Sequence, residues 1–206
     1  HLDRLDGILV ARLSQAPDDP DRMEPLARNR LDLGRPADAE PLATRLLALH
    51  PDHPAGWYVQ GQVYWAADQH LEALAMFREA EQRGGDADAG LWAARCLLLL
   101  DRYDEMDAQV ARLWPRVARD RYRTALVHQL LASRAGRTGH TARALEELDR
   151  AERAFPDVPS TALQRALLLR DAGRRAEATR EFERALRLDP TSREARRSLD
   201  ALRRGP

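Results

Sequence analysis

Two histidines come closest to the spacing of a metal site in this sequence. His50 and His53 are separated by two residues, next to Pro51 and Pro54. Imidazole nitrogens are common zinc ligands, so such a pair could form part of a zinc site. A proline directly after each histidine, however, is typical of a turn that leads into a new helix. We therefore interpret this segment as a turn, and we expect no metal there.

A second cluster consists of acidic residues: Asp101, Asp104, Glu105 and Asp107. The cluster lacks the glycine and the terminal glutamate of a calcium-binding loop. It is typical of a turn followed by a helix start, where carboxylates favour the helix dipole. The sequence has no glycine-rich phosphate loop, no HExxH and no GxSxG motif. Three further histidines have no partner that spacing singles out: His70, His128 and His140.

The composition favours a protein built of helices. Alanine, leucine, arginine and glutamate dominate, and these residues form helices readily. Aromatic residues make up 5% of the chain, and Ile8 is the only isoleucine. All 33 basic residues are arginines, which we interpret as a GC-rich coding bias rather than a design for one partner. The single cysteine, Cys96, excludes an internal disulfide.

Similar segments recur along the chain at intervals near 34 residues. Pro20, Pro54 and Pro159 each begin a helical pattern, and another opens at Ala125. Small residues recur one turn into the first helix: Ala27, Gly61, Ala94, Ala132 and Ala166. Each first helix is followed by a turn, and the residues at the same position of the five turns are Gly34, Asp68, Asp101, Gly139 and Gly173. The second helix then has a small residue, with Met106 as the exception: Ala39, Ala73, Met106, Ala144 and Ala178. The pattern predicts helical hairpins whose small residues permit close approach.

This pattern resembles the tetratricopeptide repeat, a family of 34-residue helical pairs. The resemblance implies an all-α, right-handed superhelical solenoid of antiparallel helix pairs, forming one domain over residues 1–206. We expect a leading helix, five repeats and a capping helix. Their expected bounds are 1–19, 20–53, 54–86, 87–124, 125–158, 159–192 and 193–206.

In this family the first helix of each pair lines a concave groove that holds an extended peptide or a partner helix. Carried over to this chain, the groove positions include Glu24, Arg28, Asp32, Leu98, Ser133, Leu163 and Leu167. The residues that we select as candidates for partner binding are Tyr58, Gln62, Trp65, Leu91, Trp92, Arg95, Gln129, Arg137 and Arg170.

The selected aromatic and arginine residues suggest what the groove could bind. Tyr58, Trp65 and Trp92 offer large apolar areas with hydrogen-bonding tips, as at many binding hot spots. The alternative for each tryptophan is packing between helices, which we expect for Trp57 and Tyr64. The selected arginines suit acidic side chains or a terminal carboxylate, and their alternative is a solvated helix face.

The resemblance implies a non-catalytic scaffold that binds a protein or peptide, without enzyme activity or cofactor. The alternative is the repeat domain of a larger bacterial enzyme, such as a transferase, or of an envelope or cytochrome assembly factor, where it would recruit the substrate protein. We expect no nucleic-acid binding, because arginine and glutamate alternate in the second half as they do on exposed helices. We expect no membrane insertion, because no apolar run is long enough. Both the cytoplasm and the periplasm are compatible with the sequence.

Charge is divided unevenly along the chain. Residues 1–110 hold 11 arginines and 20 acidic residues, a net charge of −9, whereas residues 111–206 hold 22 and 13, a net charge of +9. A solenoid keeps sequence order in space, so these charges are expected at opposite ends. Head-to-tail self-association is therefore among the interactions that the sequence suggests.

Overall fold

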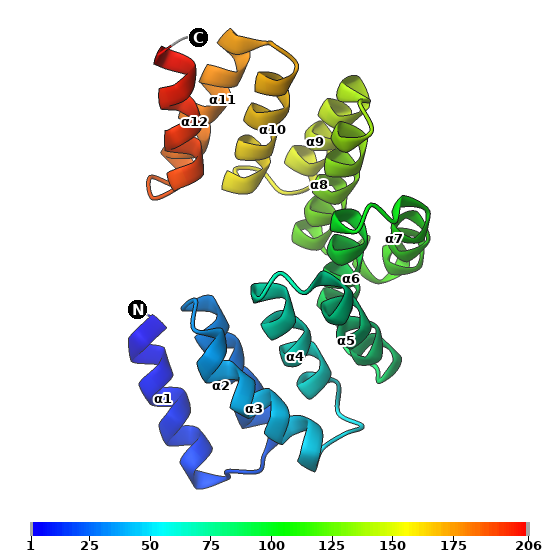
Figure 1. Cartoon of the computed structure of the whole chain (residues 1–206), viewed down its shortest axis with the longest axis vertical. Helices are drawn as coiled ribbons and strands as arrows, with labels where there is room; N and C mark the ends of the chain where they lie inside the picture. Colours follow the sequence, from blue (N-terminus) through cyan, green and yellow to red (C-terminus); the bar gives the residue numbers. More distant parts are fainter. Residues whose placement is uncertain (1, 205–206) are drawn as a thin grey trace. The chain divides into compact units, whose positions relative to one another are not determined.

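The computed structural model describes residues 2–204, which form helices and contain no strand (Figure 1). The all-α, hairpin-based fold expected from the sequence is confirmed. The helices are α1 (Leu2–Gln15), α2 (Pro20–Asp32), α3 (Pro36–Leu49), α4 (Pro54–Ala66), α5 (His70–Gln82), α6 (Ala87–Leu99), α7 (Tyr103–Val117), α8 (Arg121–Arg137), α9 (Thr141–Ala154), α10 (Pro159–Asp171), α11 (Arg175–Leu188) and α12 (Arg193–Arg204).

The chain divides into two compact units, unit 1 (His1–Leu113) and unit 2 (Trp114–Pro206). In unit 1, helices α1 to α6 pack against one another in chain order, and α2 also contacts α4. In unit 2, helices α8 to α12 pack in the same way, and α8 also contacts α10. Each unit therefore has the contacts of stacked hairpins, in which a first helix touches its own partner and the first helix of the next pair.

Helix starts follow local signals in the sequence. Helices α2, α4 and α10 begin at Pro20, Pro54 and Pro159, as the repeat pattern predicted. Helix α8, in contrast, begins at Arg121, four residues before the start expected for the fourth repeat. The carboxylate of Asp120 accepts a hydrogen bond from the backbone N–H of residue 123 at 3.0 Å, which caps the helix at this earlier point. The extra residues of the third repeat thus lengthen α7 and α8.

The turn inside each hairpin has a left-handed residue at the predicted turn position. The backbone φ is +70° at Gly34, +58° at Asp68, +56° at Asp101, +78° at Gly139 and +73° at Gly173. In each case the next residue donates its N–H to a carbonyl five residues back, for example residue 174 to Leu169 at 2.9 Å. This bond closes the helix end in the manner of a Schellman motif.

The small residues predicted from the repeat pattern lie in the core. Those of the first helices are buried, as are those of the second helices. Gly61 shows why the position must be small: a Cβ added there would lie 2.7 Å from Cε1 of the Phe77 ring. Phe77 is fully buried. Helix α4 can therefore pack this closely against α5 only because residue 61 has no side chain.

We predict that Gly61→Ala destabilises unit 1 by about 1–3 kcal/mol, the usual cost of overpacking a core. The Phe77 ring cannot move aside easily, because Tyr58 and Trp92 pack against it. Urea denaturation followed by circular dichroism measures the change. The double variant Gly61→Ala/Phe77→Leu should recover part of the loss, and an unchanged midpoint for the single variant would refute the steric account.

We also predict that Gly173→Ala lowers the free energy of unfolding by about 1 kcal/mol, because an alanine pays a steric penalty at positive φ. No atom lies within 4 Å of the added Cβ, so backbone conformation alone produces the effect. The control is Ala172→Gly, at the neighbouring exposed position. Its φ of −80° is negative, so no penalty for positive φ arises there. Equal stability of Gly173→Ala and the natural chain would contradict this prediction.

Candidate functional site

An aromatic cluster connects three helices of unit 1. It consists of Tyr58 and Trp65 on α4, Phe77 on α5 and Trp92 on α6. The ring centroids of Tyr58 and Phe77 lie 5.8 Å apart and edge on, and those of Phe77 and Trp92 lie 5.8 Å apart and stacked. The rings of Trp65 and Trp92 meet edge to face at 5.0 Å. These are favourable aromatic geometries, so the buried Phe77 ring helps to orient its neighbours.

The hydroxyl group of Tyr58 is held by a neighbouring side chain of α4. It accepts a hydrogen bond from Nε2 of Gln62 at 3.1 Å. Burial raises the pKa of Tyr58 to about 12, because the charged phenolate is poorly solvated there. The residue therefore stays neutral at physiological pH, and its hydroxyl group serves as a fixed acceptor for Gln62.

Two arginines lie over the aromatic cluster. The guanidinium of Arg28, on α2, lies 4.0 Å from the ring centroid of Tyr58 and pairs with Glu24 at 2.7 Å. The guanidinium of Arg95, on α6, lies 4.6 Å from Trp92 and 5.3 Å from Trp65. Such cation–π contacts hold a guanidinium in place while leaving its edge able to form hydrogen bonds. We call the surface formed by Arg28, Gln62, Trp65, Trp92 and Arg95, with the buried rings of Tyr58 and Phe77 beneath it, the candidate face.

The candidate face contains a hydrogen-bond donor and an acceptor that the described residues leave unsatisfied. Nε of Arg28 and Oε1 of Gln62 are buried, and neither has a hydrogen-bond partner within residues 2–204. Buried polar atoms are almost always paired in folded proteins, and an unpaired one costs about 1–3 kcal/mol. These two atoms therefore favour a ligand that offers both an acceptor and a donor.

Most of the residues selected from unit 1 lie together on this face. Gln62, Trp65 and Trp92 are half-buried and Arg95 is exposed. Tyr58 is buried, so it supports this face from beneath. Leu91 is only 5% exposed and belongs to the core. Trp57 and Tyr64, expected between helices, are half-buried.

Three residues selected from unit 2 have other local contacts. Gln129 donates to Thr161 Oγ1 at 2.7 Å, which links α8 to α10. Arg170 pairs with its neighbour Asp171 at 2.7 Å, and Arg137 is exposed in the last turn of α8.

The sequence reasoning did not foresee two histidine contacts. The His70 ring, at the start of α5, lies 4.8 Å from Trp65, so it forms part of the surroundings of the candidate face. His128 forms a 2.8 Å contact with the buried Glu147, within unit 2. Both pairs join residues of different helices, and sequence spacing alone gives no signal for them.

The other candidate clusters have structural contacts. Nδ1 of His53 accepts from the N–H of Ala55 and caps α4, while His50 contacts the carbonyl of Asp18. In the acidic cluster, hydrogen bonds from Arg78 and Arg102 lower the pKa of Glu105. Within residues 2–204, no group of three or more histidine, cysteine or acidic side chains could hold a metal ion. Across the same range, the helices are too short or too polar to cross a bilayer.

Solved structures with a similar fold include tetratricopeptide repeat proteins. A tetratricopeptide repeat protein from Parabacteroides merdae ATCC 43184 is 18% identical, with 98% of this chain and 78% of that chain covered and a TM-score of 0.81. PilW, a type IV pilus biogenesis factor, is 15% identical, with 96% and 90% covered and a TM-score of 0.74. YrrB, a TPR protein with an unusual peptide-binding site, is 16% identical, with 94% and 98% covered and a TM-score of 0.54. At these identities the likeness shows the fold alone.

Sequence comparison identifies the family. No curated protein sequence matches the chain. The profile of the tetratricopeptide repeat, however, matches residues 25–88 and 130–193, which together make up more than half of the chain. The repeat pattern, the stacked hairpins and the left-handed turn residues agree with this match. The chain belongs to the tetratricopeptide repeat family.

Proposed function

We propose that the candidate face of unit 1 binds an extended peptide segment of a partner protein, without catalysis. The observation that carries this proposal is the position of two half-buried tryptophans, Trp65 and Trp92, on neighbouring first helices. Tryptophan buries a large area at small entropic cost, and it is enriched at binding hot spots. Here both rings are already held in position by contacts with Phe77, His70 and Arg95.

The unsatisfied polar atoms support a peptide as the ligand. In an extended peptide the N–H and the C=O of one residue point to the same side, and they offer the donor and the acceptor that Oε1 of Gln62 and Nε of Arg28 lack. A purely apolar ligand would leave both atoms unpaired and would bind less well. PilW and YrrB have the same fold, and YrrB is described as having a peptide-binding site. The alternative role, as the repeat domain of a larger enzyme or assembly factor, would use this face to recruit the substrate protein.

We predict that Trp65→Ala weakens peptide binding by about 1–2 kcal/mol, roughly a factor of 5 to 30, as for a hot-spot residue. The probe is a peptide selected from a random display library against the natural chain, and fluorescence anisotropy measures its affinity. Circular dichroism should be unchanged, because Trp65 is only half-buried.

The matched control is Trp114→Ala, on α7, which removes a 39%-exposed tryptophan outside the candidate face. Its affinity should equal that of the natural chain. An equal loss in both variants, or a library that yields no binder, would argue against peptide binding at this face.

We further propose that copies of the chain associate through unit 1 of one copy and unit 2 of another. The boundary between the units coincides with the change in the sign of the charge. Unit 1 has 12 arginines and 20 acidic residues, a net charge of −8, and unit 2 has 21 and 13, a net charge of +8. Attraction between oppositely charged surfaces favours this heterologous contact.

We expect the weight-average mass in sedimentation to rise with protein concentration at low salt and to fall towards the monomer at high salt. Salt screens exposed charges, with a Debye length of about 10 Å at 0.1 M. A monomer at every salt and concentration rules out the association. Association that strengthens with salt would instead indicate an apolar interface.

A further inference from the structure

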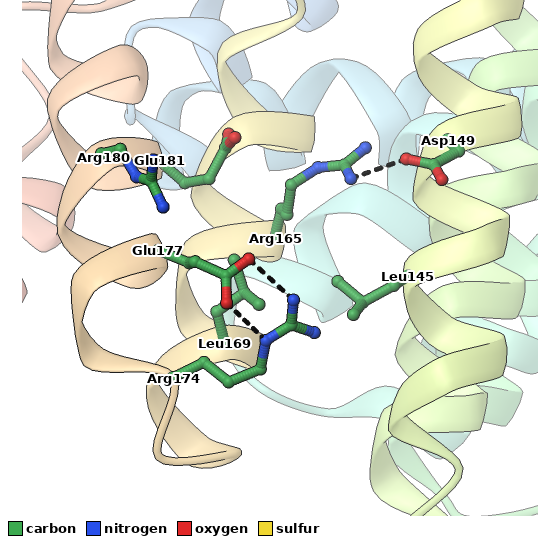
Figure 2. Close-up of a pocket in the computed structure, with 8 residues that line it drawn as sticks. All are labelled: Leu145, Asp149, Arg165, Leu169, Arg174, Glu177, Arg180 and Glu181. Carbon is green, nitrogen blue, oxygen red and sulfur yellow. Dashed lines mark hydrogen bonds and ion pairs between the residues drawn. The ribbon is translucent and has the colours of Figure 1, made fainter.

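Unit 2 contains a pocket of about 500 Å³ between α9, α10 and α11. Figure 2 shows side chains from these three helices turned towards a common space. Leu145 and Leu169 form its apolar part. The remaining lining is charged and contains three cations and three anions: Arg165, Arg174, Arg180, Asp149, Glu177 and Glu181. Pockets of this volume accommodate small molecules or a few residues of a peptide.

Two of the three acidic groups are engaged by arginines of the same pocket. Nη1 of Arg165 donates to Asp149 at 2.6 Å, and Arg174 donates two hydrogen bonds of 2.7 Å to Glu177 (Figure 2). The hydrogen bonds from Arg174 lower the pKa of Glu177, so this carboxylate stays charged and paired. A free anion or a simple cation would therefore have to compete with these ion pairs.

Two buried atoms in the same pocket lack a hydrogen-bond partner within residues 2–204, namely Nε of Arg165 and Oε2 of Glu181. This oxygen forms an ion pair of 3.7 Å with Nη1 of Arg184, which is beyond hydrogen-bond distance. Arg184 is itself bonded to Glu152 and Asp157. The pocket thus holds one unsatisfied donor and one unsatisfied acceptor, each on a different helix.

This pocket is separate from the groove positions expected on α10. Successive residues of a helix are rotated by about 100°, so Arg165 and Leu169 lie nearly opposite Leu163 and Leu167. The side of α10 that lines the pocket is consequently not the side that the family resemblance assigns to peptide binding.

We propose that this pocket is a second binding site, for a ligand with an amide group next to an aliphatic chain. An amide is neutral, so it does not disturb the ion pairs around the pocket. Its carbonyl oxygen accepts a hydrogen bond from Nε of Arg165, and its N–H donates one to Oε2 of Glu181. The aliphatic chain lies against Leu145 and Leu169. Peptide main chains and the side chains of asparagine and glutamine both supply this chemistry.

The experiment titrates matched probes, at millimolar concentrations, into the natural chain. Two-dimensional NMR of the backbone amides follows their binding. The first probe is 4-methylpentanamide. The second is methyl 4-methylpentanoate, which keeps the carbonyl and the aliphatic chain but has no N–H donor. We expect saturable shifts at residues 145–149, 165–169 and 174–181 with the amide, and affinity at least several-fold weaker for the ester. Equal binding of the two, or no saturable shift, overturns the proposal.

A third probe separates the two sources of the amide. N-methyl-4-methylpentanamide has the secondary amide of a peptide main chain. Binding as tight as that of 4-methylpentanamide indicates main-chain recognition, whereas a several-fold loss indicates a side-chain carboxamide.

Two variants of one residue test the acceptor. Glu181→Leu should abolish the amide-specific shifts, whereas Glu181→Gln, which retains a carbonyl oxygen, should keep most of them. The melting temperature of Glu181→Leu without ligand should be close to that of the natural chain, because losing the 3.7 Å ion pair with Arg184 is offset by removing a buried acceptor that has no hydrogen bond. Unchanged amide binding in Glu181→Leu assigns Glu181 a structural role and contradicts the proposal. If Glu181→Leu fails to fold, the proposal is tested by the difference in affinity between amide and ester. This difference is then measured in the natural chain and in Glu181→Gln.

Discussion

The close contact between Gly61 and Phe77 determines much of the architecture of unit 1. Because residue 61 has no side chain, α4 lies directly on the Phe77 ring. That ring in turn packs against Tyr58 and Trp92, and Tyr58 accepts a hydrogen bond from Gln62. The same buried ring therefore sets the helix spacing and orients the side chains of the candidate face. Preorganisation of this kind reduces the entropy lost when a ligand binds.

Both proposed sites combine well-satisfied ion pairs with a few unpaired polar atoms. In unit 1 these atoms belong to Arg28 and Gln62, and in unit 2 to Arg165 and Glu181. An unpaired buried polar atom lowers the free energy of unfolding of the ligand-free protein. A ligand that forms a hydrogen bond with this atom recovers the lost stability. Repeat proteins tolerate such local losses, because their stability is approximately a sum over repeats and their interfaces. The family fold thus provides a scaffold on which individual surfaces can differ in chemistry.

Sequence reasoning could predict the hairpins, because small residues and left-handed turn positions recur at a regular spacing. It could place Trp65, Trp92 and Arg95 on neighbouring first helices for the same reason. It missed the early start of α8, which depends on one capping contact by Asp120. It could not foresee that Leu91 is buried or that Gln129 bonds to Thr161, because these outcomes depend on how neighbouring hairpins pack. The pocket of unit 2 involves three helices and has no sequence signature.

The most direct test of peptide binding at the candidate face uses the four tryptophans of the chain. Each indole N–H gives its own signal in a two-dimensional ¹⁵N–¹H NMR spectrum. During titration with a selected peptide, the account predicts saturable shifts of the Trp65 and Trp92 signals, with Trp57 and Trp114 unchanged as internal references. Shifts confined to Trp57 or Trp114, with Trp65 and Trp92 unaffected by a peptide that binds, would contradict it.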